Sequence, residues 1–600
     1  MILQALTRYY ETLAQQDKVA RAGWGTAKVS FALTIGREGD LLDVMPLKVS
    51  VPRGKKTVEI PRVMRVPEQI KKSVNIASNF LCEGTGYLLG IDGKGKPERS
   101  RKCFDACRQL HLRLLQDVDV PAAKAVCAFF EKWDPQQAQA HPALHDSIEI
   151  LLKESPNLVF RFEGGFVQDI PEVARAWDER GRAGDRQAGQ GVCLVTGRRA
   201  PIARLHPAIK GVRGAQSTGA SLVSFNARAF ESYGKDGGQG LNAPVGERAA
   251  FAYGAALNYL VADDGHRKWM GDATVVYWAE NAEPGYQDFF SLAVDPSQGE
   301  KTDFTEDDLM AAMRELAKGR PYDLSGITLR PETDFYILGV SPNAGRLSVR
   351  FFYHNTFGGF MQNLDAHYRR LEIVRPKFER FACLSIGNLL FETVNKNAKD
   401  KSASPLLAGA LMRAVLNDTR YPAALLDGVM VRIRADRNVN RARAAILKAV
   451  LLKKYENTPF APIKEGLTVE LNDQTAYLPY VLGRIFYVLE NIQTSAIPGL
   501  NATIQDRYFT AACATPASIF PQLLRLKGSH MKALKRDKPG LAFNLEKELG
   551  GLMDRVHQTL PRHLTLEDQG VFILGYYHER QASFAGKPGS EKKSDTKTEG

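Results

Sequence analysis

The sequence predicts a mixed α+β fold, in which a large N-terminal part with antiparallel sheet and a basic β-ribbon is followed by a C-terminal helical bundle. Residues 27–35 and 42–51 alternate apolar and polar side chains, as half-buried strands do. Beyond about residue 381 such alternation is scarce, and apolar residues recur with the 3.6-residue period of helices. Because 44% of the 600 residues are hydrophobic, the chain can build several cores.

The N-terminal part opens with an amphipathic helix in residues 1–16. Residues 47–65 are dense in Val, Lys, Arg and Pro, which predicts an exposed β-ribbon with a basic face. Further along we expect, in order, a helix at 102–130, strands at 158–162, 192–196 and 274–278, and an antiparallel strand pair at 334–340 and 346–353 joined by a turn.

Two apolar helix faces predict the C-terminal bundle. One carries Leu482, Ile485, Phe486, Leu489 and Ile492, and the other carries Leu545, Leu549, Leu552, Met553, Val556 and Leu560. We therefore divide the chain into a mixed region 1–380, with a subdomain break near 130–190, and a helical bundle 381–585. Residues 586–600 lack large apolar side chains and are expected to form a disordered tail.

The charge balance favours a polyanionic partner, because Lys and Arg total 80 against 67 Asp and Glu, a net charge of +13. A basic protein without such a partner would show the same excess. The seven cysteines include no C-x-x-C pair, so we expect no metal site, no cofactor and a reduced, cytoplasmic setting. No run approaches the roughly 18 apolar residues of a membrane span, and signal-peptide features are lacking, so we expect no membrane partner.

Enzyme motifs are incomplete in this sequence. Residues 90–96 have the spacing of a phosphate-binding P-loop, but Pro97 stands where a magnesium-binding Ser or Thr is needed. His145 and Asp146 lack the partners of a metal-dependent phosphohydrolase, and Ser217 does not sit in a nucleophile elbow. We therefore predict no catalytic residue. A metal-dependent nuclease remains the alternative, because active sites are assembled in space.

Three basic segments suit nucleic acid. In residues 62–79 and 193–258, cations lie among amides, hydroxyl residues and glycines, a mixture that can read base edges at close approach. The predicted DNA-reading residues are Lys71, Lys72, Asn75, Asn79, Gln216, Ser217, Thr218 and Asn226. The predicted phosphate-binding residues, which include members of C-terminal basic clusters, are Arg198, Arg199, Arg204, Lys210, Arg213, Arg432, Arg434, Arg441, Lys527, Lys532, Lys535 and Arg536. Ordinary solvated surface is the alternative for each segment.

Four runs carry a family resemblance: residues 79–90, residues 193–258, VYWA at 276–279, and residues 335–360 with SPNAGRLSVRFFYHNTFGGF. They resemble the large subunit of the type I-C CRISPR Cascade complex, in order over most of the chain. The resemblance implies a non-catalytic subunit that recognises the protospacer-adjacent motif (PAM) in duplex DNA, aids unwinding and R-loop formation, and helps to recruit a helicase–nuclease.

The resemblance also implies partners. These are crRNA, double-stranded target DNA with its displaced single strand, the Cascade backbone and handle-binding subunits, the small subunit and the helicase–nuclease. Residues 481–585 resemble the small subunit itself, which this family can also make by internal translation. A scaffold that binds only the crRNA 5′ handle is a further alternative.

Overall fold

The computed structural model describes residues 1–21, 23–53, 56–69, 76–93, 95–184, 190–225, 227–231, 233, 240–296, 305–324, 326–399, 401–557 and 559–585. The chain divides into two compact units. Unit 1 comprises Met1–Ile209 and Ser221–Tyr259, and unit 2 comprises Lys210–Ala220 and Leu260–Gly600. The predicted mixed α+β class is confirmed, with several sheets in the N-terminal region and a C-terminal half that is mostly helical. The predicted tail, 586–600, lies outside the described residues.

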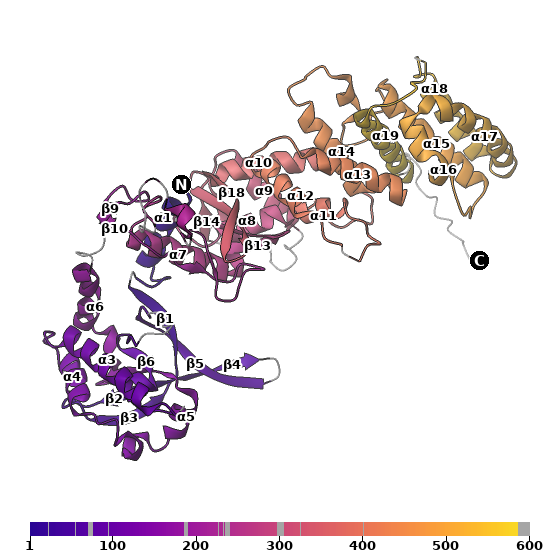
Figure 1. Ribbon diagram of the computed structural model, residues 1–600. Helices are drawn as coiled ribbons and strands as arrows, with labels where there is room; N and C mark the ends of the chain where they lie inside the picture. The colour runs from indigo at the N-terminus through magenta and orange to yellow at the C-terminus, as the bar shows by residue number, and fades with distance from the viewer. Residues whose placement is uncertain are drawn as a thin grey trace, which may run out of the picture. The chain divides into compact units, whose positions relative to one another are not determined.

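Unit 1 contains two main sheets. The first has the antiparallel order β1 (Trp24–Val29), β5 (Lys56–Pro67) and β4 (Lys48–Arg53). Its β4–β5 pair is the predicted ribbon, drawn as two long neighbouring strands in Figure 1. The second has the order β3 (Leu41–Pro46), β2 (Phe31–Ile35), β7 (Asn157–Phe162) and β6 (Cys82–Gly84), with β8 (Gly165–Phe166) paired to β7.

Two of the predicted strands are each two strands, because the chain changes sheets at Ser30 and at Leu47. The Leu47 amide donates to the Ser30 carbonyl at 2.7 Å, and the Ser30 amide donates to the Asn157 carbonyl at 3.0 Å. Residues 24–29 and 48–53 therefore enter the ribbon sheet, whereas 31–35 and 41–46 enter the other sheet. Strands were predicted correctly on both sides of each switch, but local alternation could not show that the partner strand changes.

Helices and short strands complete unit 1: α1 (Ile2–Gln15), α2 (Thr85–Leu88), α3 (Pro97–Leu115), α4 (Pro121–Lys132), α5 (Ile148–Glu154), α6 (Pro171–Gly184), β9 (Gln190–Val192), β10 (Arg199–Pro201) and β11 (Ala208–Ile209), with β12 (Ala220–Ser221) and α7 (Glu247–Ala262) at its boundary. The predicted helix 102–130 is broken at 116–120, since Pro121 starts a new helix. The predicted strand 192–196 is wrong beyond Val192, because Cys193 begins a turn in which its amide donates to the Arg198 carbonyl at 2.9 Å.

Unit 2 is built on an antiparallel sheet. Its main strands, in order, are β18 (Arg346–Thr356), β17 (Asp334–Asn343), β14 (Ala273–Ala279) and β13 (Arg267–Met270), so the predicted pair and buried strand are confirmed. A small hairpin, β15 (Tyr322–Leu324) and β16 (Ile327–Leu329), is separate. One face of the sheet carries Tyr277, Phe335 and Phe351, which share a core with α8 (Tyr286–Val294), α9 (Glu306–Ala317) and α10 (Phe357–Leu371).

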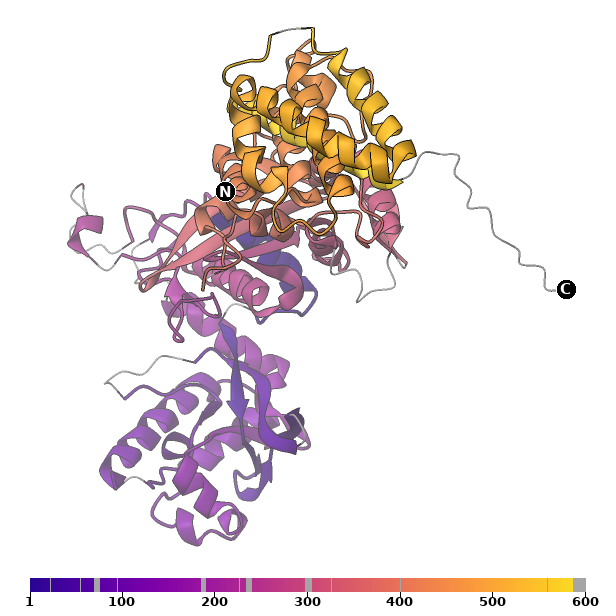
Figure 2. The ribbon, with the colours of Figure 1, turned by 90° about the vertical axis from the view of Figure 1, so that its right-hand side faces the viewer.

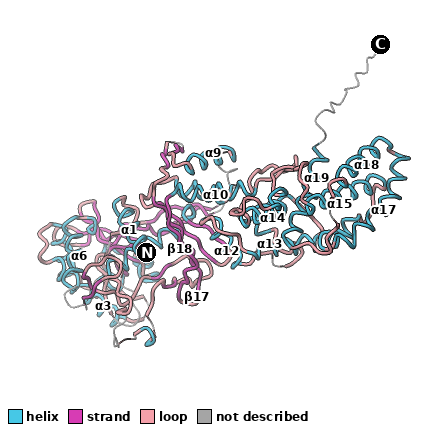
Figure 3. The backbone as a smooth tube through the Cα atoms, turned by 90° about the horizontal axis from the view of Figure 1, so that it is seen from above, coloured by secondary structure: helices cyan, strands magenta, loops and turns pink. Residues whose placement is uncertain are grey.

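Within the described residues, no strand follows β18, and Figure 3 shows helices and loops from α10 onward. The helices are α11 (Ile386–Phe391), α12 (Pro405–Leu416), α13 (Ala423–Asp436), α14 (Arg441–Lys454), α15 (Leu478–Ala496), α16 (Ile504–Ala514), α17 (Pro516–Asp537), α18 (Pro539–Met553) and α19 (Leu566–Ala585). Helices α15–α19 pack as one bundle, orange to yellow in Figure 2.

The first predicted helix face is confirmed, because all five of its residues in α15 are buried. Three residues of the second face, Leu545, Leu549 and Leu552, are buried, whereas Met553 is 36% exposed. Helices α15 and α19 approach through glycine: a Cβ at Gly483 would collide with the Phe572 carbonyl, and one at Gly575 with the Tyr480 carbonyl. The functional division at 380 stays a prediction.

Candidate nucleic-acid interface

The loop 210–220 of unit 2 has buried supports and an exposed tip. Val212 and Ala220 are buried, whereas Gln216, Ser217 and Thr218 are exposed. Two backbone turns shape the tip: the Ala215 amide donates to the Val212 carbonyl at 3.1 Å, and the Gly219 amide donates to the Gln216 carbonyl at 2.9 Å. Three predicted DNA-reading residues are thus brought together on one supported turn.

Two glycines of this loop have a left-handed backbone conformation. Gly211 and Gly214 have φ angles of +81° and +78°, which side chains rarely adopt. A Cβ on Gly214 would lie 3.3 Å from Cγ of Pro342, near the end of β17. The glycines therefore fix the path of the loop, a role that sequence analysis had assigned to close approach by a ligand.

Arg213 joins this loop to the edge strand β13. Its amide donates to Oγ1 of Thr274 at 3.2 Å, and its guanidinium carbon lies 5.5 Å from the ring centroid of Trp269. Trp269 is 56% exposed, and the Arg267 guanidinium lies 5.4 Å from the same centroid. Arg267 is itself held by the Val261 carbonyl at 2.6 Å. The result is an exposed indole flanked by Arg213, which lies on the loop, and by Arg267, which also pairs with Asp264 at 2.5 Å.

Sequence analysis missed Trp269 and Arg267. The signal was present as RKWM, an aromatic residue among cations, but the strand is short and amphipathic. Lys268, between them, belongs to the other face: its ammonium donates to the Ser291 carbonyl at 2.7 Å, and burial lowers its pKa to about 8. Strand alternation places Arg267 and exposed Trp269 on one face of β13 and half-buried Lys268 on the other.

Unit 1 carries three of the predicted phosphate-binding residues at the β9–β10 hairpin. Arg198, Arg199 and Arg204 are exposed. The turn between the strands is supported by the Gly246 amide, which donates to Sγ of Cys193 at 3.1 Å. Arg198 and Arg199 therefore lie on a supported hairpin, and Arg204 follows the end of β10 by three residues. Lys210, which is also exposed, belongs to the loop of unit 2.

The predicted DNA-reading run ending at Asn79 is described only in part. Lys71, Lys72 and Asn75 lie outside the described residues, as does Asn226. Asn79 is 5% exposed, and its backbone amide donates to Oε2 of Glu83 at 3.0 Å. In this conformation the Asn79 side chain is therefore part of the interior of unit 1, and its role in DNA reading stays a prediction.

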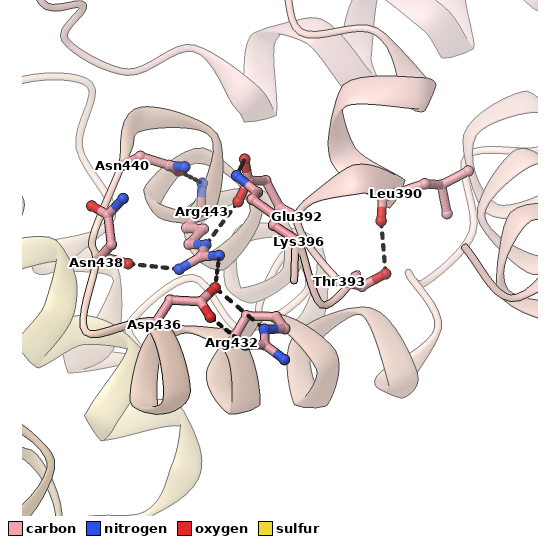
Figure 4. A network of polar contacts seen from close by, with 9 residues as sticks. All are labelled: Leu390, Glu392, Thr393, Lys396, Arg432, Asp436, Asn438, Asn440 and Arg443. Atoms are coloured by element: carbon pink, nitrogen blue, oxygen red, sulfur yellow. Dashed lines mark hydrogen bonds and ion pairs between the residues drawn. The ribbon is translucent and has the colours of Figure 1, made fainter. Parts of the chain in front are cut away.

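The basic cluster of α13 and α14 is largely engaged within the protein, as Figure 4 shows for Arg443. Its guanidinium, 1% exposed, bonds Glu392 at 2.8 Å, Asp436 at 2.5 Å and the Asn438 carbonyl at 2.9 Å. Arg432 also pairs with Asp436, and hydrogen bonds from both arginines lower the pKa of that carboxyl to about 2. Burial of a guanidinium is stabilising only with such complete pairing.

Arg434 and Arg441 have internal partners too. Arg434 donates to Oε1 of Gln569 at 2.7 Å. Arg441, 4% exposed, bonds Glu379 at 3.1 Å and donates to the carbonyls of Phe381 and Ala382. The sequence showed the cations of this cluster but could not show partners 50 to 135 residues away.

The predicted cluster on α17 is exposed. Lys532, Lys535 and Arg536 are solvent-accessible, and Lys527 is half-buried. Lys535 pairs with Glu546 at 2.6 Å and Arg536 with Asp537 at 2.8 Å. Exposed pairs of this kind contribute little stability, about 0–1 kcal/mol, so a phosphate can replace the carboxylate at small cost. Phosphate binding by these residues of α17 stays a prediction.

Metal-ligand clusters and membrane-spanning helices are both absent from the part of the chain that the structure describes. No group of three or more His, Cys, Asp or Glu side chains could hold a metal ion there. No helix among the same residues is long and apolar enough to cross a membrane. His145 and Asp146 pair with each other at 3.0 Å on the surface.

These features define a candidate nucleic-acid-binding protein, in which an exposed loop gathers amide, hydroxyl, guanidinium and indole groups. The family model described as CRISPR-associated protein (Cas_Csd1) matches residues 6–584. The chain therefore belongs to the Cas_Csd1 family, the large subunit of type I-C Cascade, which places it in a CRISPR complex with crRNA. The resemblance found in the sequence is thereby confirmed. No curated protein matches the sequence.

Proposed function

We propose that this subunit recognises the PAM in duplex DNA, aids unwinding and R-loop formation, and helps to recruit the helicase–nuclease, without catalysing a reaction itself. One observation carries the proposal: the loop 210–220 exposes Gln216, Ser217 and Thr218 and also carries Arg213, whose guanidinium lies 5.5 Å from the ring centroid of Trp269. Amides and hydroxyls can bond base edges, and a guanidinium can hold the adjacent phosphate. Family membership supports the same role.

The proposed contacts divide by chemistry. Gln216, Ser217 and Thr218 read bases, and Lys71, Lys72, Asn75, Asn79 and Asn226 stay proposed for the same task. Exposed Arg198, Arg199, Arg204, Lys210, Arg213, Lys532, Lys535 and Arg536 hold phosphates, with half-buried Lys527 beside them. Arg432, Arg434 and Arg441 would have to leave their internal partners to do so. We therefore expect these three arginines to contribute less to phosphate binding than the exposed residues.

The proposed partners follow from the family. They are crRNA, target duplex and its displaced strand, the backbone and handle-binding subunits, the small subunit and the helicase–nuclease, assembled in the cytoplasm. Residues 481–585, which contain all but the first three residues of the α15–α19 bundle, are proposed to act as the small subunit does. A nuclease and a scaffold that grips only the crRNA handle are the competing functions.

The experiment compares the assembled complex with and without this chain on duplexes of systematically varied PAM. We expect PAM-dependent binding only when the chain is present. Binding that depends on crRNA but ignores the PAM in both preparations would favour the scaffold. Metal-dependent cleavage by the chain alone, abolished by a chelator, would favour the nuclease.

A further inference from the structure

The segment between α10 and α11 presents aromatic and basic side chains to solvent. We call residues 375–381, RPKFERF, the aromatic–basic loop. Phe378 is 87% exposed and Phe381 is 39% exposed, while Arg375, Lys377 and Arg380 are exposed as well. Leaving a phenylalanine in water forgoes roughly 1.5–3 kcal/mol of burial free energy. Phe378 differs from other exposed phenylalanines in that three cations share its short loop.

The N-terminal end of the loop is attached to the helical core. The Val374 amide donates to the Val469 carbonyl at 2.9 Å, and the Tyr577 hydroxyl of α19 donates to the Val374 carbonyl at 2.7 Å. Within the loop, the Glu379 amide donates to the Pro376 carbonyl at 3.0 Å, which closes a turn around Lys377 and Phe378. The exposed ring therefore stands on a turn with a fixed base.

The C-terminal end is held by two charged side chains. Arg441 of α14 donates to the Phe381 carbonyl at 2.7 Å and to the Ala382 carbonyl. Glu306, the first residue of α9, accepts from the Ala382 amide at 2.8 Å and from the Cys383 amide. The buried guanidinium of Arg441 and the carboxylate of Glu306 therefore bond the backbone of consecutive residues, 381–383. Because this end of the loop is already fixed, the loop loses less conformational entropy on binding.

The positive charge of the loop favours a polyanionic partner. Glu379, its one acid, is bonded to Arg441 at 3.1 Å, so the remaining loop charges are the three cations. One guanidinium, that of Arg380, lies 5.9 Å from the ring centroid of Phe381. Phosphates are neutralised by such cations, and an aromatic ring offers a surface on which any unpaired base can stack.

We propose that the aromatic–basic loop is a preorganised contact for an unpaired polynucleotide. Phe378 stacks on a base, Arg375 and Lys377 hold flanking phosphates, and Arg441 and Glu306 are positioning residues. A protein partner is disfavoured, because lysine is depleted at the centre of protein interfaces and the two phenylalanines form no large apolar patch. The inference rests on the proposed function in that the chain binds nucleic acid.

The test measures binding of the full-length chain to single-stranded oligonucleotides that carry one fluorescent 2-aminopurine, in separate DNA and RNA arms. Stacking quenches this base. We expect Phe378→Ala to remove the quenching and to weaken binding about 10-fold, whereas Phe378→Trp retains both. The matched control is Phe460→Ala, because Phe460 is 94% exposed on another loop of unit 2, and its variant should bind as the wild type does.

A double variant, Arg375→Ala with Lys377→Ala, tests the phosphate contacts. Removing two of them should reduce the slope of log affinity against log salt by about 1.4, and Phe378→Ala should leave that slope unchanged. An effect confined to RNA would assign the loop to the guide, and one confined to DNA would assign it to the displaced strand. Either supports the proposal.

Failure of this inference is distinguishable from failure of the proposed function. If the wild-type chain binds neither oligonucleotide, this inference is overturned, whereas the proposed function is decided separately by PAM-dependent duplex binding of the assembled complex. If the wild type binds and Phe378→Ala binds equally well with full quenching, only the loop assignment is overturned. Loss of the other Cascade subunits on purification of Phe378→Ala, with oligonucleotide binding intact, would overturn it in favour of a protein contact.

Discussion

The guanidinium of Arg213 lies 5.5 Å from the ring centroid of Trp269, although the two residues are 56 positions apart in the sequence. The Arg213 amide is bonded to Thr274, which pairs with Trp269 across the β13–β14 ladder. This relationship ties a glycine-rich loop to the edge of the sheet of unit 2. Through these contacts, the guanidinium of Arg213 and the indole of Trp269 lie together, and the loop that carries Arg213 also exposes its polar tip residues.

Loss of the indole should weaken nucleic-acid binding. We expect Trp269→Ala to reduce the affinity of the assembled complex for target DNA about 10-fold, because one stacked or cation-bearing aromatic contributes about 1–3 kcal/mol. Trp269→Phe should retain most of the affinity. The measurement is equilibrium binding at fixed salt. Equal affinity of the wild type and Trp269→Ala would remove the indole from the interface.

The Arg443 network should matter for stability alone. Arg443→Ala leaves Glu392 and Asp436 without their buried partner, and we expect a loss of about 3–5 kcal/mol, seen as a clear fall in the thermal midpoint. The matched control is Arg536→Ala, since Arg536 pairs with Asp537 on the surface and should contribute under about 1 kcal/mol. Similar midpoints for the two variants would contradict the ranking.

Substitution of Gly483 at the α15–α19 contact should destabilise the fold. Gly483→Ala puts a methyl group against the Phe572 carbonyl, so we expect a strong fall in the thermal midpoint or failure to fold. Gly528, inside α17, has open space around it, and Gly528→Ala should stabilise the helix by up to about 1 kcal/mol. A Gly483→Ala variant as stable as Gly528→Ala would exclude the close approach.

Buried histidines should make the fold sensitive to acid. Burial lowers the pKa of His367 and of His578 to about 3, and each ring bonds a tyrosine hydroxyl. Since the unfolded pKa is 6.5, the unfolded chain binds more protons below that pH. Stability is therefore full above pH 6.5 and falls by about 1.4 kcal/mol per histidine per pH unit from 6.5 towards 3.

The check is the pH dependence of the unfolding midpoint, with His578→Gln as the variant. Glutamine cannot gain the proton, so the decline between pH 6.5 and 4.5 should be shallower than in the wild type. A matched control is His145→Gln, because His145 is exposed on the surface. Parallel profiles for the wild type and His578→Gln would show that this histidine does not titrate on unfolding.

Patterns of short range predicted the fold class well. The apolar face of α15 follows from the 3.6-residue period, the buried strand β14 from a short apolar run, and the β17–β18 pair from two apolar runs joined by a turn. Alternation did not reveal that the chain changes sheets at Ser30 and Leu47. The strand that pairs with each segment is set by contacts with residues far away in the sequence, such as the bond from Ser30 to Asn157. The sequence also could not separate Arg213, which reaches the surface, from Arg441, which is buried among distant carbonyls.

Base reading by the loop 210–220 is tested most directly by comparing two affinities of one assembled complex. Gln216, Ser217 and Thr218 are replaced together by Ala, and binding is measured to duplexes with and without the PAM. We expect the preference for the PAM duplex to fall at least 10-fold, while binding to a guide-complementary single strand is unchanged. Lys532→Ala with Arg536→Ala should weaken both duplexes alike. Equal weakening of both duplexes by the loop variant, with the preference intact, would contradict base reading by this loop.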